Sequence, residues 1–483
     1  MKWFVVVAVA GCGRIGFSDL ALGDGGSNEP FAITVPATQL PATAVKFTSN
    51  HADAVWTADA GTISADGVFV APSTEGAIGI HATSGTETLD AEVSVTLSIT
   101  AVVVGETGTM LVPSGHGSQT HGFYSAAQKQ WWVVYSSSQT ETQLRATSSP
   151  DFKTFVEGPA VDLQKTIGEG RDLDVAYRVL NGHEVVHVSE AYEQGFGRVH
   201  LRGELTGAGL QWGAPLAINT GGQVTPDGTA VAITESGQVI DSTGYLPTPQ
   251  TPPLTPCGNG DVVMYTADQL DDGTTSFDTM TYKQEVIWCV PTYVNARWLG
   301  TDGDTIYQLY EDGLGQPDTQ NIKLQIRKSD QWLPIETTYT VPPNAFGTDA
   351  TTNISDWSAT IVGRAIHAVR RNNATVALEH AVLDLDGSGA FIAGGMMGNQ
   401  GGTVGSGVIV APYGEGVIAA QISANQILYA FYRNGEWSKW FTLSAPSSMG
   451  RTGLSAIANG PDAKPALLWT DTVGTSLDGA ALP

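Results

Sequence analysis

The feature that most constrains the fold of this chain is a degenerate repeat that runs from about residue 101 to residue 483. Each unit has a short apolar segment, a second segment that ends in aromatic or β-branched residues, a third segment, and a turn that closes on an aromatic residue. Successive turn aromatics are 57, 65, 55, 59 and 46 residues apart. These aromatics are Phe155, Trp212, Phe277, Trp332, Phe391 and Trp437. Helical periodicity is almost missing here, so the pattern predicts an all-β region.

Four short strands per repeat is the composition of a β-propeller blade. The first strands of the units start near residues 121, 172, 228, 293, 356, 406 and 452, which favours seven blades. Six is the alternative, because the third unit carries the insert YLPTPQTPPLTPCGNG (245–260), which is too rich in proline for a central strand. The last unit lacks a fourth strand, and we expect TAVVVGETGTMLVP (100–113) to supply it and to close the ring.

Residues 31–100 have a different pattern, in which short segments alternate apolar and polar side chains between turns every 8–12 residues. This spacing predicts a small antiparallel sandwich. The stretch WTADAGTISADGVFVAPSTEG resembles bacterial Ig-like domains of cell-surface proteins. The resemblance implies that Trp56 fills the core, that ISADGVFVAP forms a hairpin, and that the domain is a spacer or adhesive module.

The N-terminus begins MKWFVVVAVAGC, with one lysine before an apolar run that is too short to span a bilayer as a helix. The tetrapeptide VAGC resembles the bacterial lipobox, which implies cleavage before Cys12 and lipidation of its thiol. We therefore expect a lipoprotein signal peptide at 1–11, a flexible tether at 12–30, an Ig-like domain at 31–100 and a propeller at 101–483. The mature protein is predicted outside the cytoplasm, held at the outer membrane or cell surface by its lipid alone.

The other two cysteines fit an oxidising compartment. Cys257 and Cys289 form an even pair once Cys12 is lipidated, and a disulfide between them is predicted. Neither cysteine lies beside a histidine, and no spacing typical of a zinc site occurs, so the sequence predicts no metal and no cofactor.

Charge excludes one class of partner. The chain has 48 acidic and 23 basic residues, which gives a formal net charge of −25. The electrostatic field of a protein with this negative charge repels the phosphate backbone of nucleic acids, so nucleic-acid binding is not expected.

Ligands of propellers bind at the mouth of the central channel, where the start of each first strand points. Ten candidate binding residues follow from this rule: His116, His121, Arg171, Asp172, Asp174, Asp227, Arg297, Asp356, Trp357 and Arg451. Carboxylates facing one another could act as general acid and base, and arginine forks could hold a ligand carboxylate. The other interpretation is that these groups pair with each other and with water to line a wet channel.

GEGRDLDVAY (168–177) is the densest of these segments. Asp172 and Asp174 alternate with apolar residues, so both carboxylates are expected on one face of a strand. A Ca²⁺ or sugar site is one interpretation of this pair, and solvated carboxylates in the channel are the other.

RATSSPDFKTF (145–155) resembles the Asp-box turn of sialidase-like β-propellers, with Lys153 in place of the usual glycine. Such turns lie on the outer rim, so this resemblance implies a fold and not a site. Sialidases of this family use a Phe/Tyr-Arg-Ile-Pro segment and a Tyr–Glu nucleophile pair, and neither can be assigned here. The catalytic residues therefore stay unknown.

These observations predict a cell-surface lipoprotein whose propeller binds a glycan or a surface protein. One alternative is a divergent sialidase-like carbohydrate-active hydrolase, and a second is a non-enzymatic envelope scaffold or assembly protein. Because the nucleophile and the arginine motif cannot be assigned, the prediction leans away from an enzyme.

Overall fold

The structure is a computed structural model of residues 1–483. For some strands the structure describes only the backbone. It describes residues 30–39, 44–72, 76–95, 101–106, 119–136, 143–163, 170–192, 197–219, 223–224, 229–246, 261–274, 281–289, 297–312, 321–328, 331–332, 339–340, 357–372, 377–385, 391–397, 404–414, 416–423, 426–433, 435–438, 440–443, 451–461, 464–471 and 476–482.

The chain divides into two compact units, residues 1–98 with the terminal Pro483, and residues 99–482. The secondary structure described in both units is β, with no α-helix in any described segment, which confirms the predicted all-β class. Among these residues no helix is long and apolar enough to cross a membrane.

The first unit packs three small antiparallel or mixed sheets around one core. The largest sheet has the order β2-β9-β8-β5, a second has the order β3-β7-β6, and β1 pairs with β4. The strand bounds are β1 (Ile33–Thr34), β2 (Thr38–Gln39), β3 (Ala44–Lys46), β4 (Thr48–Ser49), β5 (Val55–Ala58), β6 (Thr62–Ile63), β7 (Val68–Val70), β8 (Gly76–Ser84) and β9 (Glu87–Val95).

Alternation of buried and exposed residues along β8 and β9 places one face of the large sheet in the core. Trp56 is buried there with Phe47 and Phe69, as expected for the anchor of this unit. The predicted hairpin is formed by β6 and β7, with Ile63 opposite Phe69. The Ig-like nature of the unit stays a prediction.

The second unit consists, in its described part, of seven antiparallel sheets that follow one another along the chain. We number them sheet 1 to sheet 7. Sheet 1 holds β11 (Gly122–Ser125), β12 (Gln130–Ser136), β13 (Gln143–Ser149), β14 (Val156–Glu157) and β15 (Val161–Asp162). Sheet 2 holds β16 (Gly170–Leu180), β17 (His183–Tyr192), β18 (Gly197–Thr206), β19 (Gly209–Trp212) and β20 (Leu216–Asn219). Sheet 3 holds β21 (Gln223–Val224), β22 (Ala230–Ile233), β23 (Val239–Leu246), β24 (Asp261–Ala267) and β25 (Tyr282–Cys289).

The remaining sheets have the same consecutive order. Sheet 4 holds β26 (Arg297–Asp302), β27 (Thr305–Asp312), β28 (Asn321–Lys328), β29 (Gln331–Trp332) and β30 (Tyr339–Thr340). Sheet 5 holds β31 (Trp357–Val362), β32 (Ala365–Asn372), β33 (Ala377–Asp384) and β34 (Phe391–Met397). Sheet 6 holds β35 (Val404–Tyr413), β36 (Gly416–Ser423), β37 (Gln426–Arg433), β38 (Glu436–Trp437) and β39 (Phe441–Thr442). Sheet 7 holds β40 (Arg451–Ile457), β41 (Ala466–Asp471) and β42 (Ser476–Ala481), with β10 (Val102–Glu106) as its fourth strand.

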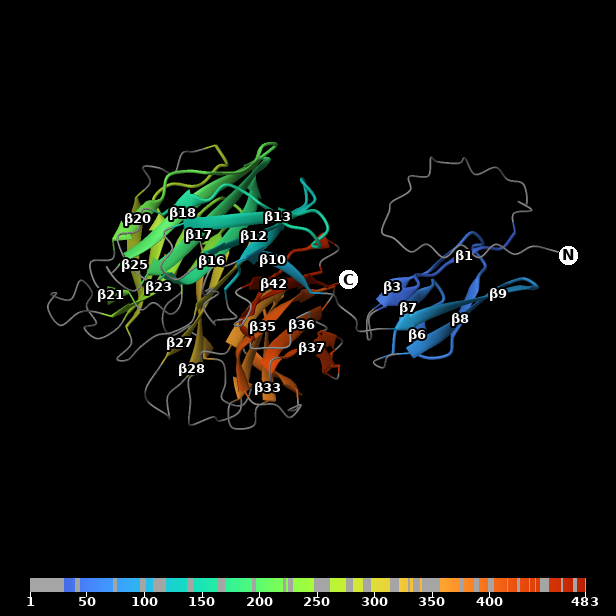
Figure 1. The fold of residues 1–483 in the computed structure, drawn as a ribbon. Coiled ribbons are helices and arrows are strands. Elements are labelled where there is room, and N and C mark those ends of the chain that lie inside the picture. Colours follow the sequence, from blue (N-terminus) through green and yellow to red (C-terminus); the bar gives the residue numbers. More distant parts are fainter. Residues whose placement is uncertain are drawn as a thin grey trace. The chain divides into compact units, whose positions relative to one another are not determined.

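The seven first strands form a closed cycle. β11, β16, β22, β26, β31, β35 and β40 each contact the next, and β40 returns to β11. The ring closes where the predicted N-terminal strand β10 pairs with the C-terminal β42, with Val102 opposite Gly479; the two lie side by side in Figure 1. This arrangement is a β-propeller closed by an N-terminal strand, as predicted. Its described part holds seven sheets, and the number of blades stays a prediction.

The core of this unit lies between the sheets, because both faces of most strands carry apolar side chains. Phe123 and Trp132 of sheet 1 pack on Leu173 and Val186 of sheet 2. Similar clusters join sheet 7 to sheet 1, sheet 4 to sheet 5, and sheet 5 to sheet 6. Burial of this apolar surface, at roughly 25 cal/mol per Å², is the main force that holds neighbouring sheets together.

The turn within RATSSPDFKTF lies between β13 and β14, the third and fourth strands of sheet 1. Asp151 accepts the backbone N–H of Lys153 at 3.0 Å and lies 3.3 Å from the Ser149 hydroxyl, which donates to it. The buried Phe152 and the half-buried Phe155 join the apolar cluster between sheets 1 and 7. This turn is therefore a packing element of the outer part of the sheet.

Candidate functional site

Four first strands are joined by one buried carboxylate and its neighbours. Asp174, the fifth residue of β16, accepts the backbone N–H of Thr120, just before β11, at 2.7 Å and that of Val231, on β22, at 2.8 Å. Gln119 extends this set, since its side-chain amide donates to the Thr229 carbonyl at 3.1 Å and its own carbonyl accepts from Ser455 on β40 at 3.0 Å. Sheets 7, 1, 2 and 3 are thus joined through their first strands.

Burial dominates the electrostatics of Asp174. It raises the pKa of the carboxyl to about 7, the charge of Asp241 adds to this rise, and the backbone N–H donors oppose it. Both oxygens accept N–H groups of neighbouring sheets, so the described role of Asp174 is to fasten three sheets together.

Two further sequence candidates are also buried. His121 is 3% exposed, its Nε2 has no hydrogen-bond partner among the described residues, and burial lowers its pKa to about 4. Trp357 is fully buried in the apolar cluster between sheets 4 and 5. Both side chains contribute to packing between sheets.

The other candidates are placed only in part. His116, Asp227 and Asp356 lie outside the described residues, as do Cys12 and Cys257. For a second group the backbone lies in a strand while the side chain is not described: Arg171, Asp172, Arg297, Arg451 and Cys289. Arg297 and Arg451 are the first residues of β26 and β40, as expected for first strands, and the disulfide stays a prediction.

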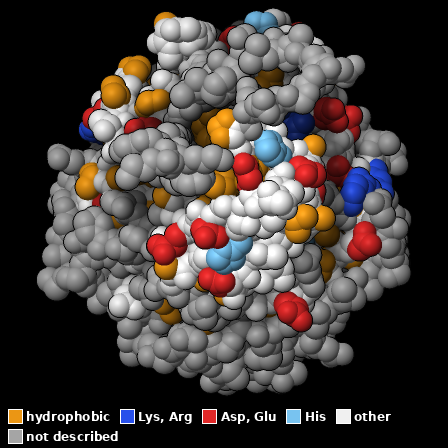
Figure 2. Space-filling model, turned by 90° about the vertical axis from the view of Figure 1, so that its right-hand side faces the viewer, with side chains coloured by type: hydrophobic (Ala, Val, Ile, Leu, Met, Phe, Trp, Pro, Cys, Tyr) orange, Lys and Arg blue, Asp and Glu red, His pale blue; other side chains and the backbone are white. Residues whose placement is uncertain are grey.

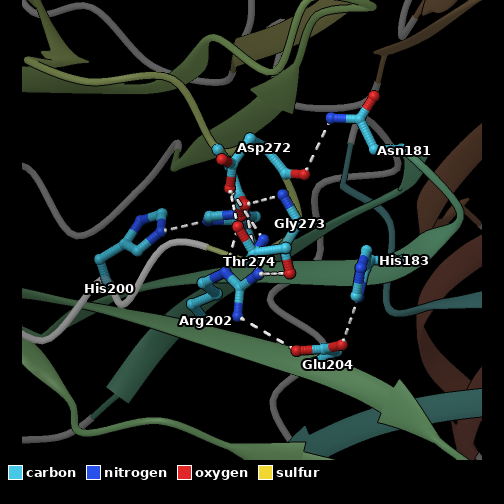
Figure 3. Close-up of polar contacts among 10 residues, drawn as sticks. Asn181, His183, His200, Arg202, Glu204, Asp272, Gly273 and Thr274 are labelled. Carbon is cyan, nitrogen blue, oxygen red and sulfur yellow. Dashed lines mark hydrogen bonds and ion pairs between the residues drawn. The ribbon is translucent and has the colours of Figure 1, made fainter.

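A polar network that sequence reasoning missed lies between sheets 2 and 3 (Figure 3). Its side chains come from β17, β18, β23 and the segment after β24. We call it the histidine network and define it as His187, Ser189, His200, Arg202, Asp241 and Asp271. Most of its members are completely buried.

The network contains four groups in a row. The Asp271 carboxylate lies 2.9 Å from Nε2 of His187, whose Nδ1 lies 2.8 Å from Nε2 of His200. Nδ1 of His200 lies 3.2 Å from the Asp241 carboxylate, which accepts the Ser189 hydroxyl at 3.0 Å on its other oxygen. Two carboxylates therefore end a chain of two imidazoles.

Arg202 fixes one end of this row. Its guanidinium donates to both oxygens of Asp271, at 2.7 and 3.2 Å, and to the Gly273 carbonyl at 3.0 Å. Burial alone would raise the pKa of Asp271, but the hydrogen bonds from His187 and Arg202 outweigh it and lower the pKa to about 2. Asp271 is therefore ionised throughout the physiological range.

Two glycines allow the segment after β24 to reach sheet 2. Gly237 has φ of +89°, its carbonyl accepts the Asp271 N–H at 2.8 Å, and a Cβ there would lie 1.9 Å from the Asp271 carbonyl oxygen. Gly273 has φ of +87°, and a Cβ there would lie 2.6 Å from Cβ of His183. Both positions need glycine for the left-handed backbone and for the close approach.

The rim of the network is more exposed. His183 lies 2.9 Å from Glu204, and Asn181 donates to the Asp272 carbonyl at 3.1 Å, as Figure 3 shows. The Asn181 contact ties the hairpin between β16 and β17 to the segment after β24, and the His183 contact ties it to β18.

A tyrosine and a glutamate also meet in sheet 2, although they are seven positions apart in the sequence. The Tyr177 hydroxyl donates to Glu184 at 2.5 Å, and the Ser125 hydroxyl of sheet 1 donates to the same oxygen. Burial, together with the carboxylate, raises the pKa of Tyr177. A raised pKa makes the phenol a poorer nucleophile, so this pair is suited to joining sheets and not to covalent catalysis.

The first unit has an exposed histidine between two carboxylates. Nδ1 of His81 lies 2.7 Å from Asp90, and its Nε2 lies 3.2 Å from Asp59. The hydrogen bond to Asp90, then that to Asp59, raises the pKa of His81. Figure 2 shows a face on which acidic side chains outnumber basic ones and border histidines.

No group of three or more His, Cys, Asp or Glu side chains able to hold a metal occurs among the residues that the structure describes. The Ca²⁺ interpretation of Asp172 and Asp174 thus has one described carboxylate, which backbone N–H groups already occupy.

No protein-family model matches the sequence, and no curated protein matches it. The chain is similar to a sialidase of Trypanosoma rangeli bound to 2,3-difluorosialic acid (10% identity, TM-score 0.41, 78% of this chain and 57% of that one). It is similar to an α-L-arabinofuranosidase of Fusarium graminearum (11% identity, TM-score 0.40, 71% of this chain and 98% of that one). It is also similar to the Aleuria aurantia lectin bound to α-methyl-L-fucoside (11% identity, TM-score 0.36, 64% of this chain and 95% of that one). At these values the similarities carry no inference about the ligand or activity of this chain.

Proposed function

We propose that the propeller is a binding module, and that its ligand is a glycan or a surface protein recognised at the end of the ring where the first strands begin. The observation that carries this proposal is the set of contacts among Gln119, Thr120, Asp174, Thr229 and Ser455, which joins four first strands. Several sequence candidates lie within a few residues of these anchored positions.

Chain connectivity supports the proposal. Arg171 and Asp172 come three and two residues before Asp174, Asp227 comes two residues before Thr229, and Arg451 comes four residues before Ser455. We expect residues this close along the chain to share one end of the ring. Arginines and carboxylates presented from several strands can hydrogen-bond sugar hydroxyls and pair with charged groups of a ligand.

Binding is favoured over hydrolysis by the state of the described groups. Glycoside hydrolysis needs two carboxyls that face a substrate, about 5–10 Å apart. Asp174 uses both oxygens to hold neighbouring sheets, and Tyr177 has a raised pKa, so neither is suited to attack or to proton transfer on a substrate.

We further propose that the chain is a lipoprotein held outside the cytoplasm through Cys12. The support is the sequence VAGC after an apolar run. Cys12→Ser is expected to release the protein from the membrane fraction, and continued membrane association would contradict the anchor without touching the binding proposal.

A glycan array probed with the purified full chain in detergent tests the binding function. We expect wild-type binding that Arg171→Ala and Asp172→Ala each weaken about tenfold or more, which corresponds to about 1.4 kcal/mol. Asp151→Ala is the matched control, because it removes an acidic side chain from a turn on the outer part of sheet 1, and its affinity is expected to equal that of wild type.

Two results would count against the proposal. Equal loss in Arg171→Ala and in Asp151→Ala would mean that the anchored end is not the binding surface. Release of chromogenic product from a panel of glycosides would favour the divergent hydrolase, while no binding and no turnover would favour the envelope scaffold.

A further inference from the structure

The histidine network can be examined by counting its hydrogens. Three hydrogen-bond contacts occur in a row, from Asp271 to His187, from His187 to His200, and from His200 to Asp241. Each contact needs one hydrogen. Two neutral imidazoles carry only one N–H each, so they supply two.

A contact without its hydrogen would set two lone pairs against each other in a buried place. His187, Asp241 and Asp271 are completely buried, and His200 is 2% exposed. Water cannot relieve such a repulsion there, and an unsatisfied buried polar group is costly. The geometry therefore requires a third hydrogen.

The surroundings favour the same result. Asp241 and Asp271 are completely buried, and Arg202 pairs with Asp271. In a medium of low polarity a contact that holds a hydrogen is strongly preferred over one between two lone pairs.

The groups that face the network come from every element packed around it. β17 supplies His187 and Ser189, and β18 supplies His200, Arg202 and, at the rim, Glu204 paired with His183. β16 and β23 supply Asp174 and Asp241, the segment after β24 supplies Asp271, and β25 supplies Tyr282, whose ring centroid is 5.4 Å from that of His200.

The two ends of the row differ in where a proton can be held. Asp271 has a pKa of about 2 and is already neutralised by Arg202. Burial lowers the pKa of His187 to about 4, so His187 carries one hydrogen at neutral pH and directs it from Nε2 to Asp271. His200 then donates from Nε2 to His187. The place left for the third hydrogen is the contact between Nδ1 of His200 and Asp241.

We propose that sheets 2 and 3 are joined by a pH-sensitive clasp, in which His200 and Asp241 together hold one proton more than a neutral histidine and a carboxylate would hold. The proton lies between Nδ1 of His200 and Oδ2 of Asp241. Loss of this proton leaves the contact repulsive and weakens the junction of the two sheets. The clasp is independent of any ligand at the channel.

The direction of the pH effect follows from proton linkage. In the unfolded chain a histidine has a pKa of about 6.5, so at pH 8 it is neutral and the aspartate is ionised. The folded clasp then binds one proton more than the unfolded chain. Its contribution to stability is complete below about pH 6.5 and is lost when a further rise in pH removes the extra proton.

Asp241→Asn is the decisive variant. The asparagine oxygen can accept from Ser189 while its amide donates to Nδ1 of His200. Two neutral histidines then satisfy all three contacts, and no extra proton is needed. We expect the folded-to-unfolded ratio of wild type, relative to this variant, to fall by up to tenfold per pH unit between pH 7 and pH 9 in urea unfolding.

His367→Gln is the matched control, because His367 lies in a second buried histidine pair, 3.0 Å from His380. That single contact needs only one hydrogen, so its loss is expected to leave the pH dependence above pH 7 unchanged. A wild type and an Asp241→Asn variant with the same pH dependence between pH 7 and pH 9 would overturn the proposal.

Wild-type protein labelled with ¹⁵N-histidine provides a readout that does not depend on variants folding. At pH 7 we expect Nε2 of His200 to carry a hydrogen and Nδ1 to be protonated or to accept a hydrogen bond from a protonated Asp241. An Nδ1 of His200 with neither signature would overturn the clasp. His200→Gln identifies the resonance by its disappearance.

Discussion

Two interfaces of the propeller carry the same short sequence pattern and use it differently. Between sheets 2 and 3, His187 on β17 and His200 on β18 are thirteen residues apart, and so are His367 on β32 and His380 on β33 between sheets 5 and 6. In both pairs Nδ1 of the first ring lies within 3.0 Å of Nε2 of the second. The two pairs thus share this contact, although the rings of the first are tilted by 53° and those of the second are stacked at 11°.

Their surroundings differ. The first pair ends in two carboxylates and an arginine. The second lies against Tyr432 and Trp437 of sheet 6, with ring centroids 4.4 and 5.0 Å from that of His380, beside an apolar cluster. A cross-strand histidine pair is thus compatible with a charged or an aromatic partner sheet, and the partner decides whether it binds an added proton.

The largest effect is expected from Asp271→Ala, which removes the carboxylate that Arg202 and His187 share. A buried guanidinium left without its partner costs about 3–5 kcal/mol of unfolding free energy. Urea unfolding of the purified protein measures this loss. A loss under about 1 kcal/mol would show that water reaches Arg202 and that the interface is not dry.

Replacing the second histidine of each pair by phenylalanine compares the two interfaces directly. His200→Phe removes one hydrogen-bond partner from each of Asp241 and His187 and is expected to cost about 2–4 kcal/mol, since each lost buried contact costs about 1–3 kcal/mol. His380→Phe keeps a ring against Tyr432 and Trp437 and is expected to cost less than about 1.5 kcal/mol. Equal losses of unfolding free energy in the two variants, measured in urea, would mean that the cost does not depend on which sheet packs against the histidine pair.

A smaller effect is expected from His367→Gln at acid pH. Burial lowers the pKa of His367 to about 4, below the value of about 6.5 in an unfolded chain. The unfolded chain therefore binds more protons between pH 4 and 6.5, and the stability present above pH 6.5 is lost as the pH falls. The variant should weaken this dependence by up to tenfold in the folding equilibrium per pH unit, while unchanged acid sensitivity would contradict a neutral buried His367.

The smallest effect is expected at His81, which has carboxylate partners like His200 but is exposed. Asp90→Asn should lower the pKa of His81 toward its ordinary value, and Asp59→Asn should lower it less, because Asp90 is the stronger cause of the rise. A histidine with a raised pKa stabilises the fold below its unfolded pKa, and this contribution is lost as pH rises. NMR titration of His81 measures both shifts, and a larger shift in Asp59→Asn would reverse the assignment.

Much of the fold could be predicted from the sequence, because strand period and turn spacing are local properties. The predicted starts of the first strands near residues 121, 172 and 356 lie within two residues of the starts of β11, β16 and β31. The closing strand was predictable as well, since a last unit with three strands needs a fourth. The second strand of the irregular third unit, β23, was not identified, because the proline-rich insert that follows it hides the repeat.

The candidate site could be predicted less well. Asp174 was found by its position at the start of a first strand, but sequence alone does not show that backbone N–H groups of two other sheets occupy its oxygens. The histidine network was missed altogether. Its one sequence signal is the repeated thirteen-residue spacing of histidines on second and third strands, and its carboxylates, Asp241 and Asp271, belong to a different repeat.

The sequence by itself determined the all-β class, the repeat and the closure of the ring, because these follow from the periodicity of side chains along one segment and from the need to cover a sheet edge. Only the tertiary structure decided which polar groups are buried away from water. Whether His200 meets a carboxylate and His380 meets aromatic rings depends on which sheet packs against each, at separations of 41 to 57 residues along the chain. Protonation depends on those neighbours and not on the local pattern.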